Sequence, residues 1–356
     1  MQGVPHKMKI GNFDLEKDGT YIIAELSANH GGKIEIAKET IKAAKEIGAN
    51  AIKLQTSKAE LITLNCKKDD FIVKGGTLWD GRSLFDLYSE TQLPWEWHEE
   101  LFRYARELGI DIFSSPFDKT AVDFLEQLNP SAYKIASFEI TDYELIRYTA
   151  SKGKPIIIST GIATINEIQD AVDICRSEGN NDIILLKCTS AYPAALEDAN
   201  LMTIPNLAET FGVISGFSDH TLGTTAPVVA VTLGAKVIEK HFILDKSIGG
   251  ADADFSLDKR EFSEMIQAVR DTEKLQGVVD YKMNEKKKKS RRFSRSLYIS
   301  KDIKKGDIFT NENIRSVRPG YGVHPKYINK VLGQQASQNF ELGDSLDLEF
   351  EKSSER

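Results

Sequence analysis

Short, continuously apolar runs recur along most of the chain, and each is followed by a stretch with helical periodicity. Apolar residues without a polar alternation are typical of strands that are buried on both faces of a parallel sheet. The sequence therefore predicts eight buried strands, at residues 21–27, 51–55, 111–115, 132–137, 155–159, 183–188, 213–217 and 236–241.

Amphipathic stretches separate these strands, with apolar residues at steps of three and four. They lie at residues 34–47, 97–108, 118–128, 142–151, 164–177 and 223–233. Strands that alternate with helices form βαβ units and a parallel sheet. Eight such strands are enough to close a (β/α)8 TIM barrel, which we favour over an open doubly wound sheet. The predicted barrel domain spans residues 1–280.

The composition changes near residue 275. Residues 285–292 (EKKKKSRR) are basic and contain no apolar side chain. Such a run is either a nucleic-acid patch or a solvated segment, and the acidic chain as a whole favours a basic linker over residues 281–293. Residues 294–350 then combine short strand patterns with Gly-Asp and Pro-Gly turns, which predicts a small, β-rich C-terminal domain.

One connection is longer than a barrel requires. Residues 66–91 separate the second predicted strand from the third. Long connections of this kind are usually functional lids or disordered segments, and both readings stay open here.

Charge and cysteine content narrow the class of protein. The net charge is −7 and the sequence pI is about 5.6, which argues against a nucleic-acid partner. Cys66, Cys175 and Cys188 are an odd number of cysteines without a CxxC pair, so we expect no disulfide framework and a reducing compartment. No apolar run reaches the ~20 residues of a membrane span, and the N-terminus has no apolar signal core. We expect a cytoplasmic protein without a membrane partner.

Polar residues gather where each predicted strand ends. The carboxyl ends of the strands form one rim in a TIM barrel, and this rim carries the active site. In strand order the residues are Glu25 and Ser27; Lys53 and Gln55; Ser114 and Ser115; Lys134, Ser137 and Glu139; Ser159, Thr160 and Gly161; Lys187, Thr189, Ser190 and Tyr192; Ser218, Asp219 and His220; Glu239, Lys240 and His241. The pattern predicts a polar site at this rim.

Three of these residues are lysines, Lys53, Lys134 and Lys187, and we expect all three to point into the barrel mouth. Each of them could instead do no more than pair with a neighbouring carboxylate. Together with the serines they make a site rich in cations and hydroxyl donors, which suits an anion that carries phosphate and carboxylate. Phosphoenolpyruvate carries both groups.

Two histidines, His220 and His241, end the seventh and eighth strands, which are neighbours in a barrel. They could share a metal ion or act in hydrogen bonding and proton transfer, and their spacing does not choose between these roles. Asp219, Glu25 and Asp252 could complete or orient a metal shell, with manganese, iron, zinc or cobalt as the ion. Of the remaining histidines, we expect His30 near the mouth and His6, His98 and His324 at surface or structural positions.

Motifs along nearly the whole chain resemble the sialic acid synthase family. They are AELSANHGG at 24–32, IKLQT at 52–56, SSPFD at 114–118, YKIAS at 133–137, ISTG at 158–161, LKCTSAYP at 186–193, GFSDHT at 216–221 and EKHF at 239–242. In the tail, SRSLY, DIKKGD and VRPGYG resemble the antifreeze-like (SAF) domain of the same enzymes. Residues 75–90 and 93–98 are most similar to the branch of the family that makes pseudaminic acid, and residues 250–253 and Ser190 depart from the sialic acid pattern.

The resemblance implies an activity. A synthase of this branch joins phosphoenolpyruvate to 2,4-diacetamido-2,4,6-trideoxy-L-altrose, giving pseudaminic acid and phosphate by C–C bond formation and C–O cleavage. An N-acetylneuraminate or legionaminic acid synthase is the alternative within the family. A Schiff-base pyruvate aldolase that uses Lys134 or Lys187, or a carbohydrate- or ice-binding module, would be a protein of another class.

The resemblance also implies roles for individual residues. His220 and His241 would bind a divalent metal, most often Mn²⁺, with Mg²⁺ or Co²⁺ as alternatives, and Glu25 would be the catalytic carboxylate. Arg318 would reach into the barrel of the partner in a domain-swapped homodimer. The phosphoenolpyruvate set would be Lys53, Ser115, Lys134, Ser137, Ser159, Ser190 and Ser218, and the acceptor-sugar set Gln55, Glu139, Tyr192, Asp252 and Arg318.

Overall fold

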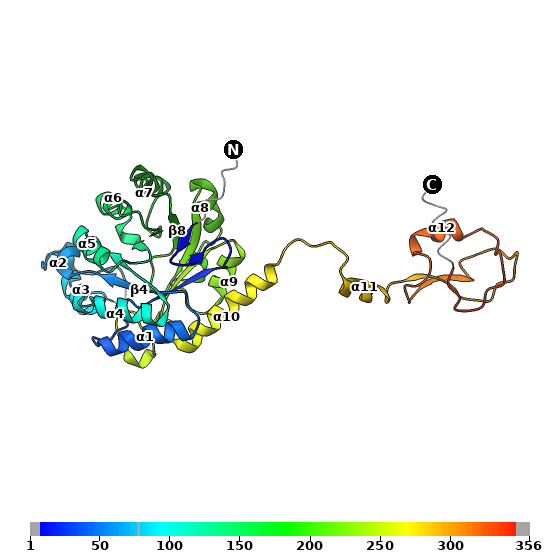
Figure 1. Cartoon of the computed structure of the whole chain (residues 1–356), viewed down its shortest axis with the longest axis horizontal. Helices are drawn as coiled ribbons and strands as arrows, with labels where there is room; N and C mark the ends of the chain where they lie inside the picture. The colour runs from blue at the N-terminus through cyan, green and yellow to red at the C-terminus, as the bar shows by residue number, and fades with distance from the viewer. Residues whose placement is uncertain (1–7, 77–78, 347–356) are drawn as a thin grey trace. The chain divides into compact units, whose positions relative to one another are not determined.

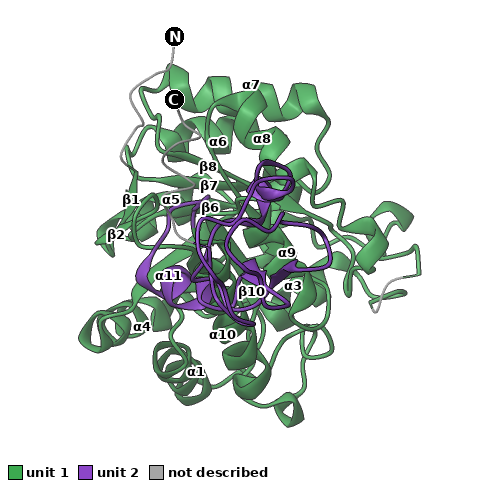
Figure 2. Ribbon diagram, turned by 90° about the vertical axis from the view of Figure 1, so that its right-hand side faces the viewer, with its two compact units in different colours: residues 1–277 green, residues 278–356 purple. Residues whose placement is uncertain are grey.

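The computed structural model describes residues 8–76 and 79–346. The chain forms two compact units, residues 1–277 and 278–356, which Figure 2 colours separately and which are described here one at a time. The expectations for His6 and for the outer ends of the two predicted domains, residues 1–7 and 347–350, fall outside the described residues. Residues 77–78 of the long connection do so as well.

A closed barrel of parallel strands forms the centre of the first unit (Figure 1), and it confirms the predicted (β/α)8 fold. The last barrel strand pairs directly with the first, so the sheet has no free edge. Within the described residues the barrel strands are β3 (Tyr21–Glu25), β4 (Ala51–Thr56), β5 (Asp111–Pro116), β6 (Tyr133–Ile135), β7 (Ile156–Ser159), β8 (Ile183–Cys188), β9 (Ile214–Asp219) and β10 (Val237–His241).

Helices surround the barrel. The six predicted helices are present as α1 (Ile34–Glu46), α4 (Trp95–Leu108), α5 (Lys119–Gln127), α6 (Tyr143–Ala150), α7 (Ile165–Ser177) and α9 (Thr225–Thr232). The structure adds α8 (Thr203–Phe211) and α10 (Lys259–Gln276), and short 3-10 turns η2 (Ser137–Glu139), η3 (Leu196–Asp198) and η4 (Lys246–Ile248). Capping boxes start two of the helices, with Thr164 and Glu167 at α7 and Asp258 and Glu261 at α10.

Two apolar layers follow from the alternation of side chains along each strand. Along β8, Ile183 and Leu185 pack against the helices, whereas Ile184 and Leu186 pack inside the barrel. The inner cluster also includes Met8, Ile10 and Leu15, which come from the N-terminal hairpin β1 (Lys9–Ile10) and β2 (Phe13–Asp14) and its flanks. The amino end of the barrel is therefore filled with apolar side chains, and this leaves the carboxyl end for chemistry.

The long connection after β4 contains regular structure. The helix α2 (Ala59–Ile62) precedes residues 66–91, which hold the 3-10 turn η1 (Asp69–Phe71) and α3 (Leu84–Thr91). Ser83 caps α3 by accepting a hydrogen bond from the backbone N–H of Asp86, and Ile72 forms a β-bridge with Ser83. Of the two interpretations left open for residues 66–91, the regular structure of these described parts favours the lid over a disordered segment.

The second unit contains the predicted β-rich domain, and the basic run that precedes it forms an exposed helix, α11 (Glu285–Arg291). Its elements are the antiparallel pair β11 (Ser296–Ile299) and β12 (Ile314–Val317), the 3-10 turn η5 (Pro325–Tyr327) and the short helix α12 (Ile328–Val331). They enclose a small core of their own, which includes Leu297, Phe309 and Val323. Among the described residues, no helix is long and apolar enough to cross a membrane.

Candidate active site

A ring of polar side chains lies above the apolar filling of the barrel. Side chains two positions apart on a strand lie on the same side of the sheet. On most strands the residue two positions after an inward apolar residue therefore also points into the barrel, nearer to its carboxyl end. Nearly all of these residues are polar, and each is at most 5% exposed. In strand order the ring, which we call the polar layer, consists of Glu25, Lys53, Ser115, Lys134, Ser159, Cys188, Ser218 and Glu239.

Ion pairs across the barrel interior connect this layer. The Lys53 Nζ lies 2.9 Å from Oε2 of Glu25 and 2.7 Å from Oε1 of Glu239. The Lys134 Nζ lies 3.9 Å from the same Glu239 oxygen and donates a 2.7 Å hydrogen bond to the Ser159 hydroxyl. Burial alone would raise the pKa of Glu239, but Lys134 and Lys53 outweigh it and hold this pKa at about 2. Two buried cations are thus held in place against two carboxylates.

Several hydroxyl groups beside the lysines are available to a ligand. The buried Ser115 Oγ has no hydrogen-bond partner among the described residues. Ser190 donates a 3.1 Å hydrogen bond to Ser137, and both hydroxyls face the bare backbone of Gly161. A Cβ atom at Gly161 would lie 2.4 Å from Ser190 Oγ and 2.7 Å from Ser137 Oγ. Only glycine leaves this hollow open, which suits a phosphate oxygen.

The two histidines lie side by side at the rim, with ring centroids 5.3 Å apart. The Nδ1 of His220 lies 3.0 Å from the carbonyl oxygen of Thr189, a contact that requires a proton on Nδ1 and leaves the Nε2 lone pair free. The Nδ1 of His241 lacks a hydrogen-bond partner among the described residues and lies 3.7 Å from Asp252 Oδ2. Burial is the main cause that lowers the pKa of both rings to about 3, so both are neutral at pH 7.

These residues fit a divalent metal. Neutral imidazoles with a free lone pair are good ligands for such an ion. Within residues 8–76 and 79–346 no group of three or more His, Cys, Asp or Glu side chains is arranged to hold one. The two imidazoles would hold the ion, and positions left open on it could take substrate or water.

Two of the predicted acceptor-sugar residues of the first unit, Tyr192 and Asp252, lie beside the histidines. Gln55 donates hydrogen bonds to Glu25 (2.8 Å) and Ser27 (3.0 Å). The Tyr192 ring lies 4.5 Å from the His220 ring. Burial raises the pKa of Glu139 to about 7, although Lys134 opposes the shift. Arg318 belongs to the second unit, so its predicted role at this rim stays a prediction.

The expectation that three lysines share the mouth is wrong. Lys187 has the same outward register along β8 as Ile183 and Leu185. Its ammonium group donates a 2.7 Å hydrogen bond to the carbonyl oxygen of Cys188. A one-residue step along a strand reverses the side on which a side chain lies. Cys188 therefore occupies the inward position of this strand.

Asp219 also lies on the outer side of the barrel wall, where it is bonded to Lys240 and Thr221. It therefore does not complete a shell around the histidines. His30 is buried, accepts a 3.1 Å hydrogen bond from the Gly32 N–H, and is close enough to Asp252 for its charge to act on the pKa of the ring.

The sequence analysis assigned no substrate-binding or catalytic role to three residues of the site: Glu239, Cys188 and Gly161. The strand alternation could have found the first two, because each stands two positions after an inward apolar residue. The sequence pattern places Gly161 at the rim but gives it no role, because its importance depends on side chains from η2 and from the turn after β8.

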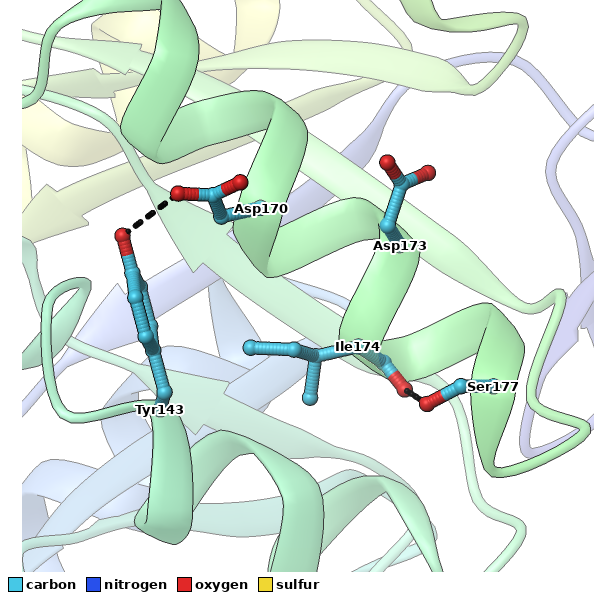
Figure 3. A pocket seen from close by; sticks show the side chains of 5 residues that line it. All are labelled: Tyr143, Asp170, Asp173, Ile174 and Ser177. Atoms are coloured by element: carbon cyan, nitrogen blue, oxygen red, sulfur yellow. Dashed lines mark hydrogen bonds between the residues drawn. The ribbon is translucent and has the colours of Figure 1, made fainter.

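A separate hollow of about 420 Å³ lies on the helical surface between α6 and α7 (Figure 3). Tyr143 donates a 2.9 Å hydrogen bond to Asp170 across it, and Asp173, Ile174 and Ser177 complete the lining. These five residues include no cation and no histidine, so the hollow does not offer the chemistry of the barrel mouth.

Two models of known protein families match this chain. The NeuB family model matches residues 40–281, and the SAF domain model matches residues 294–348. The chain belongs to the NeuB family. Enzymes of the NeuB family generally use a divalent metal, in agreement with the two neutral imidazoles at the rim.

Individual relatives cover nearly the whole of this NeuB-family chain. It is 53% identical over 339 residues to the pseudaminic acid synthase of Campylobacter jejuni, covering 95% of this chain and 98% of that one. It is 37% identical to the N,N'-diacetyllegionaminic acid synthase of Legionella pneumophila, over 92% and 93% of the two chains. The crystal structure of the spore coat polysaccharide biosynthesis protein SpsE of Bacillus subtilis is similar with a TM-score of 0.66 and 35% identity, over 95% and 97% of the chains.

Proposed function

We propose that this protein is a pseudaminic acid synthase. It is a transferase that condenses phosphoenolpyruvate with 2,4-diacetamido-2,4,6-trideoxy-L-altrose, giving pseudaminic acid and phosphate. One observation carries the proposal: a buried layer of two lysines and several hydroxyls adjoins two neutral imidazoles at a single barrel mouth. The higher identity to a pseudaminic than to a legionaminic acid synthase supports this acceptor over its alternatives.

Phosphoenolpyruvate binds to the polar layer in this proposal. Lys53 receives the carboxylate, because it stands between Glu25 and Glu239 on the side of the layer near the histidines. Lys134 and the hydroxyls around it receive the phosphate. Lysine ammonium groups and serine hydroxyls are suited to these oxygens because they provide donors without a competing acceptor charge. The phosphate cradle comprises Lys134, Ser115, Ser137, Ser159, Ser190 and Ser218.

The acceptor sugar binds in its open-chain form beside the histidines. Gln55, Glu139, Tyr192 and Asp252 hold its polar groups. Asp252 is buried and the other three are partly buried, which restricts the access of bulk water to the reacting carbon. A divalent cation held by His220 and His241, which we propose to be Mn²⁺ with Mg²⁺ or Co²⁺ as alternatives, would polarise the aldehyde carbonyl as a Lewis acid.

The bond changes follow from this arrangement. Carbon 3 of phosphoenolpyruvate attacks the aldehyde carbon and forms the new C–C bond, while the C=O π bond opens and the aldehyde oxygen takes up a proton to become a hydroxyl. Water then adds at carbon 2. Glu25, held by Gln55 and Lys53, accepts a proton from that water. The bond between carbon 2 and the bridging oxygen breaks, and the oxygen leaves with the phosphate.

The aldolase alternative is less compatible with the site. A Schiff-base lysine needs an amine that is free to attack the substrate carbonyl carbon. Lys134 instead donates hydrogen bonds to Ser159 and to the Ile135 carbonyl oxygen, and Lys187 points away from the mouth. Borohydride treatment in the presence of pyruvate should leave the protein mass unchanged, and a stable adduct would favour the aldolase.

We further propose a domain-swapped homodimer in which Arg318 reaches the partner's barrel. Leu275, Val278, Val279 and Tyr281, next to the boundary between the units, are 85–92% exposed in the single chain. A contiguous apolar segment of this kind is typical of an interface with another copy. Light scattering should give the mass of a dimer, and Arg318→Ala should weaken binding of the acceptor sugar more than binding of phosphoenolpyruvate. We place the enzyme in the cytoplasm, and its product in flagellin or surface glycans.

A phosphate-release assay tests the proposed function. The protein is incubated with phosphoenolpyruvate, Mn²⁺ and one of three acceptors, namely the pseudaminic precursor, the legionaminic precursor or N-acetylmannosamine. We expect phosphate only with the first, or at least a rate about tenfold higher. With ¹⁸O in the bridging position of phosphoenolpyruvate, the label should appear in the phosphate, and unlabelled phosphate would contradict C–O cleavage.

A further inference from the structure

A buried ion pair stands directly behind the two histidines. Asp219, the last residue of β9, pairs in register with Lys240, the last but one residue of β10. Both side chains are 0% exposed. The Lys240 ammonium group donates hydrogen bonds to Asp219 Oδ2 and to the carbonyl oxygen of Thr221. One cation therefore joins the carboxyl ends of the two strands that carry the histidines.

This pair lies on the opposite side of the barrel wall from the reacting groups. Ser218 and Glu239, the preceding residues of the same two strands, belong to the inward polar layer. Because side chains alternate along a strand, Asp219 and Lys240 point outward. The carboxylate of Glu261, in the first turn of α10, is close enough to raise the pKa of Lys240, so the pair lies on the side of α10. The pair therefore acts on substrate only through its neighbours.

The neighbours of the pair are the histidines themselves. Asp219 Oδ1 accepts hydrogen bonds from the backbone N–H and the hydroxyl of Thr221, both 2.8 Å long. The backbone is thus fixed immediately before and immediately after His220. His241 follows Lys240 directly in the sequence, so the same cation also anchors the backbone that carries the second imidazole.

We propose that Asp219 and Lys240 are positioning residues that set the separation and orientation of His220 and His241 for a shared divalent cation. The inference rests on the proposed function, which places that cation at the two imidazoles. A buried ion pair adds little net stability, because desolvation offsets most of the attraction between the charges. The pair at this place would instead fix the geometry of the metal ligands. Mutation of groups that orient metal ligands typically lowers metal affinity 10- to 100-fold.

The test measures Mn²⁺ affinity of the full-length, chelator-stripped protein from the electron paramagnetic resonance signal of free Mn²⁺. Lys240→Met removes the cation from the pair and should weaken Mn²⁺ binding by about tenfold or more. Tyr21→Phe is the matched control. It removes a buried 2.7 Å hydrogen bond to Asp111 at the amino end of the barrel, and it should lower the melting temperature without changing Mn²⁺ affinity.

A milder variant covers the case in which Lys240→Met does not fold. Thr221→Val keeps the ion pair and removes one hydrogen bond to Asp219, and it should weaken Mn²⁺ binding severalfold in a protein that stays folded. Wild-type affinity in Thr221→Val and in any folded Lys240→Met protein would overturn the inference alone. A wild-type protein that binds no divalent cation would overturn this inference and the metal in the proposed function together.

Discussion

The ammonium group of Lys53 on β4 and the carboxylate of Glu239 on β10 meet at 2.7 Å across the barrel interior, although β3 separates their strands. Glu239 also lies 3.9 Å from Lys134. A single carboxylate thus balances both of the lysines that we expect to bind phosphoenolpyruvate. It lies within ion-pair distance of both before the substrate arrives, so the anion enters a site whose ammonium groups are already in place.

Glu239→Gln should destabilise the protein, because two buried lysines lose part of their counter-charge. We expect a loss of about 3 kcal/mol in the free energy of unfolding, measured by urea denaturation. Phosphoenolpyruvate should restore more stability to this variant than to the wild type, since the anion replaces the missing charge. Glu100→Gln, which removes a partly exposed pair with Lys38, is the control and should cost less than about 1 kcal/mol. Equal losses in both variants would contradict the proposed balance.

Gly161→Ala should abolish the phosphate cradle, because the added methyl group would lie 2.4 Å from Ser190 Oγ. We expect the affinity for phosphoenolpyruvate, measured by calorimetry, to fall by about tenfold or more. Gly179→Ala makes the same substitution at a left-handed position with open space around it, so it should cost stability and leave binding unchanged. Wild-type affinity in Gly161→Ala would show that no ligand enters this hollow.

The buried His98 should make the folded protein less stable at acidic pH. It is fully buried against Thr56, with Nε2 2.8 Å from the hydroxyl, and burial lowers its pKa to about 4. In the unfolded chain His98 binds a proton below about pH 6.5, whereas in the folded protein it stays neutral down to about pH 4. The contribution of neutral His98 to the free energy of unfolding is therefore complete above pH 6.5 and is lost as the pH falls towards 4. The loss should approach 3 kcal/mol, about 1.4 kcal/mol for each pH unit. The slope between pH 6.5 and 4 should become shallower in His98→Gln, and an unchanged slope would assign the effect to other groups.

Metal removal should stop the reaction, and Mn²⁺ should restore it. His241→Asn should weaken Mn²⁺ binding by about 100-fold and reduce turnover accordingly, because one of two protein ligands is lost. His324→Asn is the matched control, since His324 caps a 3-10 turn in the second unit and asparagine is also a good capping residue. Activity that persists in the presence of a strong chelator would contradict a role for the metal.

We expect Trp79 to contribute to the selection of the acceptor sugar. Its ring lies 5.9 Å from that of Tyr192, which contacts His220, so the long connection reaches the histidine side of the mouth. Trp79→Ala should raise the KM for the acceptor sugar several-fold and leave the KM for phosphoenolpyruvate near the wild-type value. Leu64→Ala changes an exposed residue just before the connection and should alter neither constant. A rise in both constants would mean that the connection acts on the whole mouth.

The sequence by itself determined the barrel and the place of its chemistry. Continuous apolar runs such as Ile183–Leu186 require burial on both faces, and eight of them leave few alternatives to a closed parallel sheet. Because the carboxyl ends of all strands in such a sheet meet at one rim, the polar residues that end each run had to meet there. The proximity of His220 and His241 follows from this rule.

Only the tertiary structure decided which of these residues share a face and which pairs of them touch. Lys187 and Asp219 end their strands as plausibly as Lys53 does, yet a shift of one residue in register turns them to the helical side. The bond between Lys53 and Glu239 joins residues 186 positions apart. Such contacts depend on strand tilt and on the packing of every other strand, and no local pattern in the sequence records them.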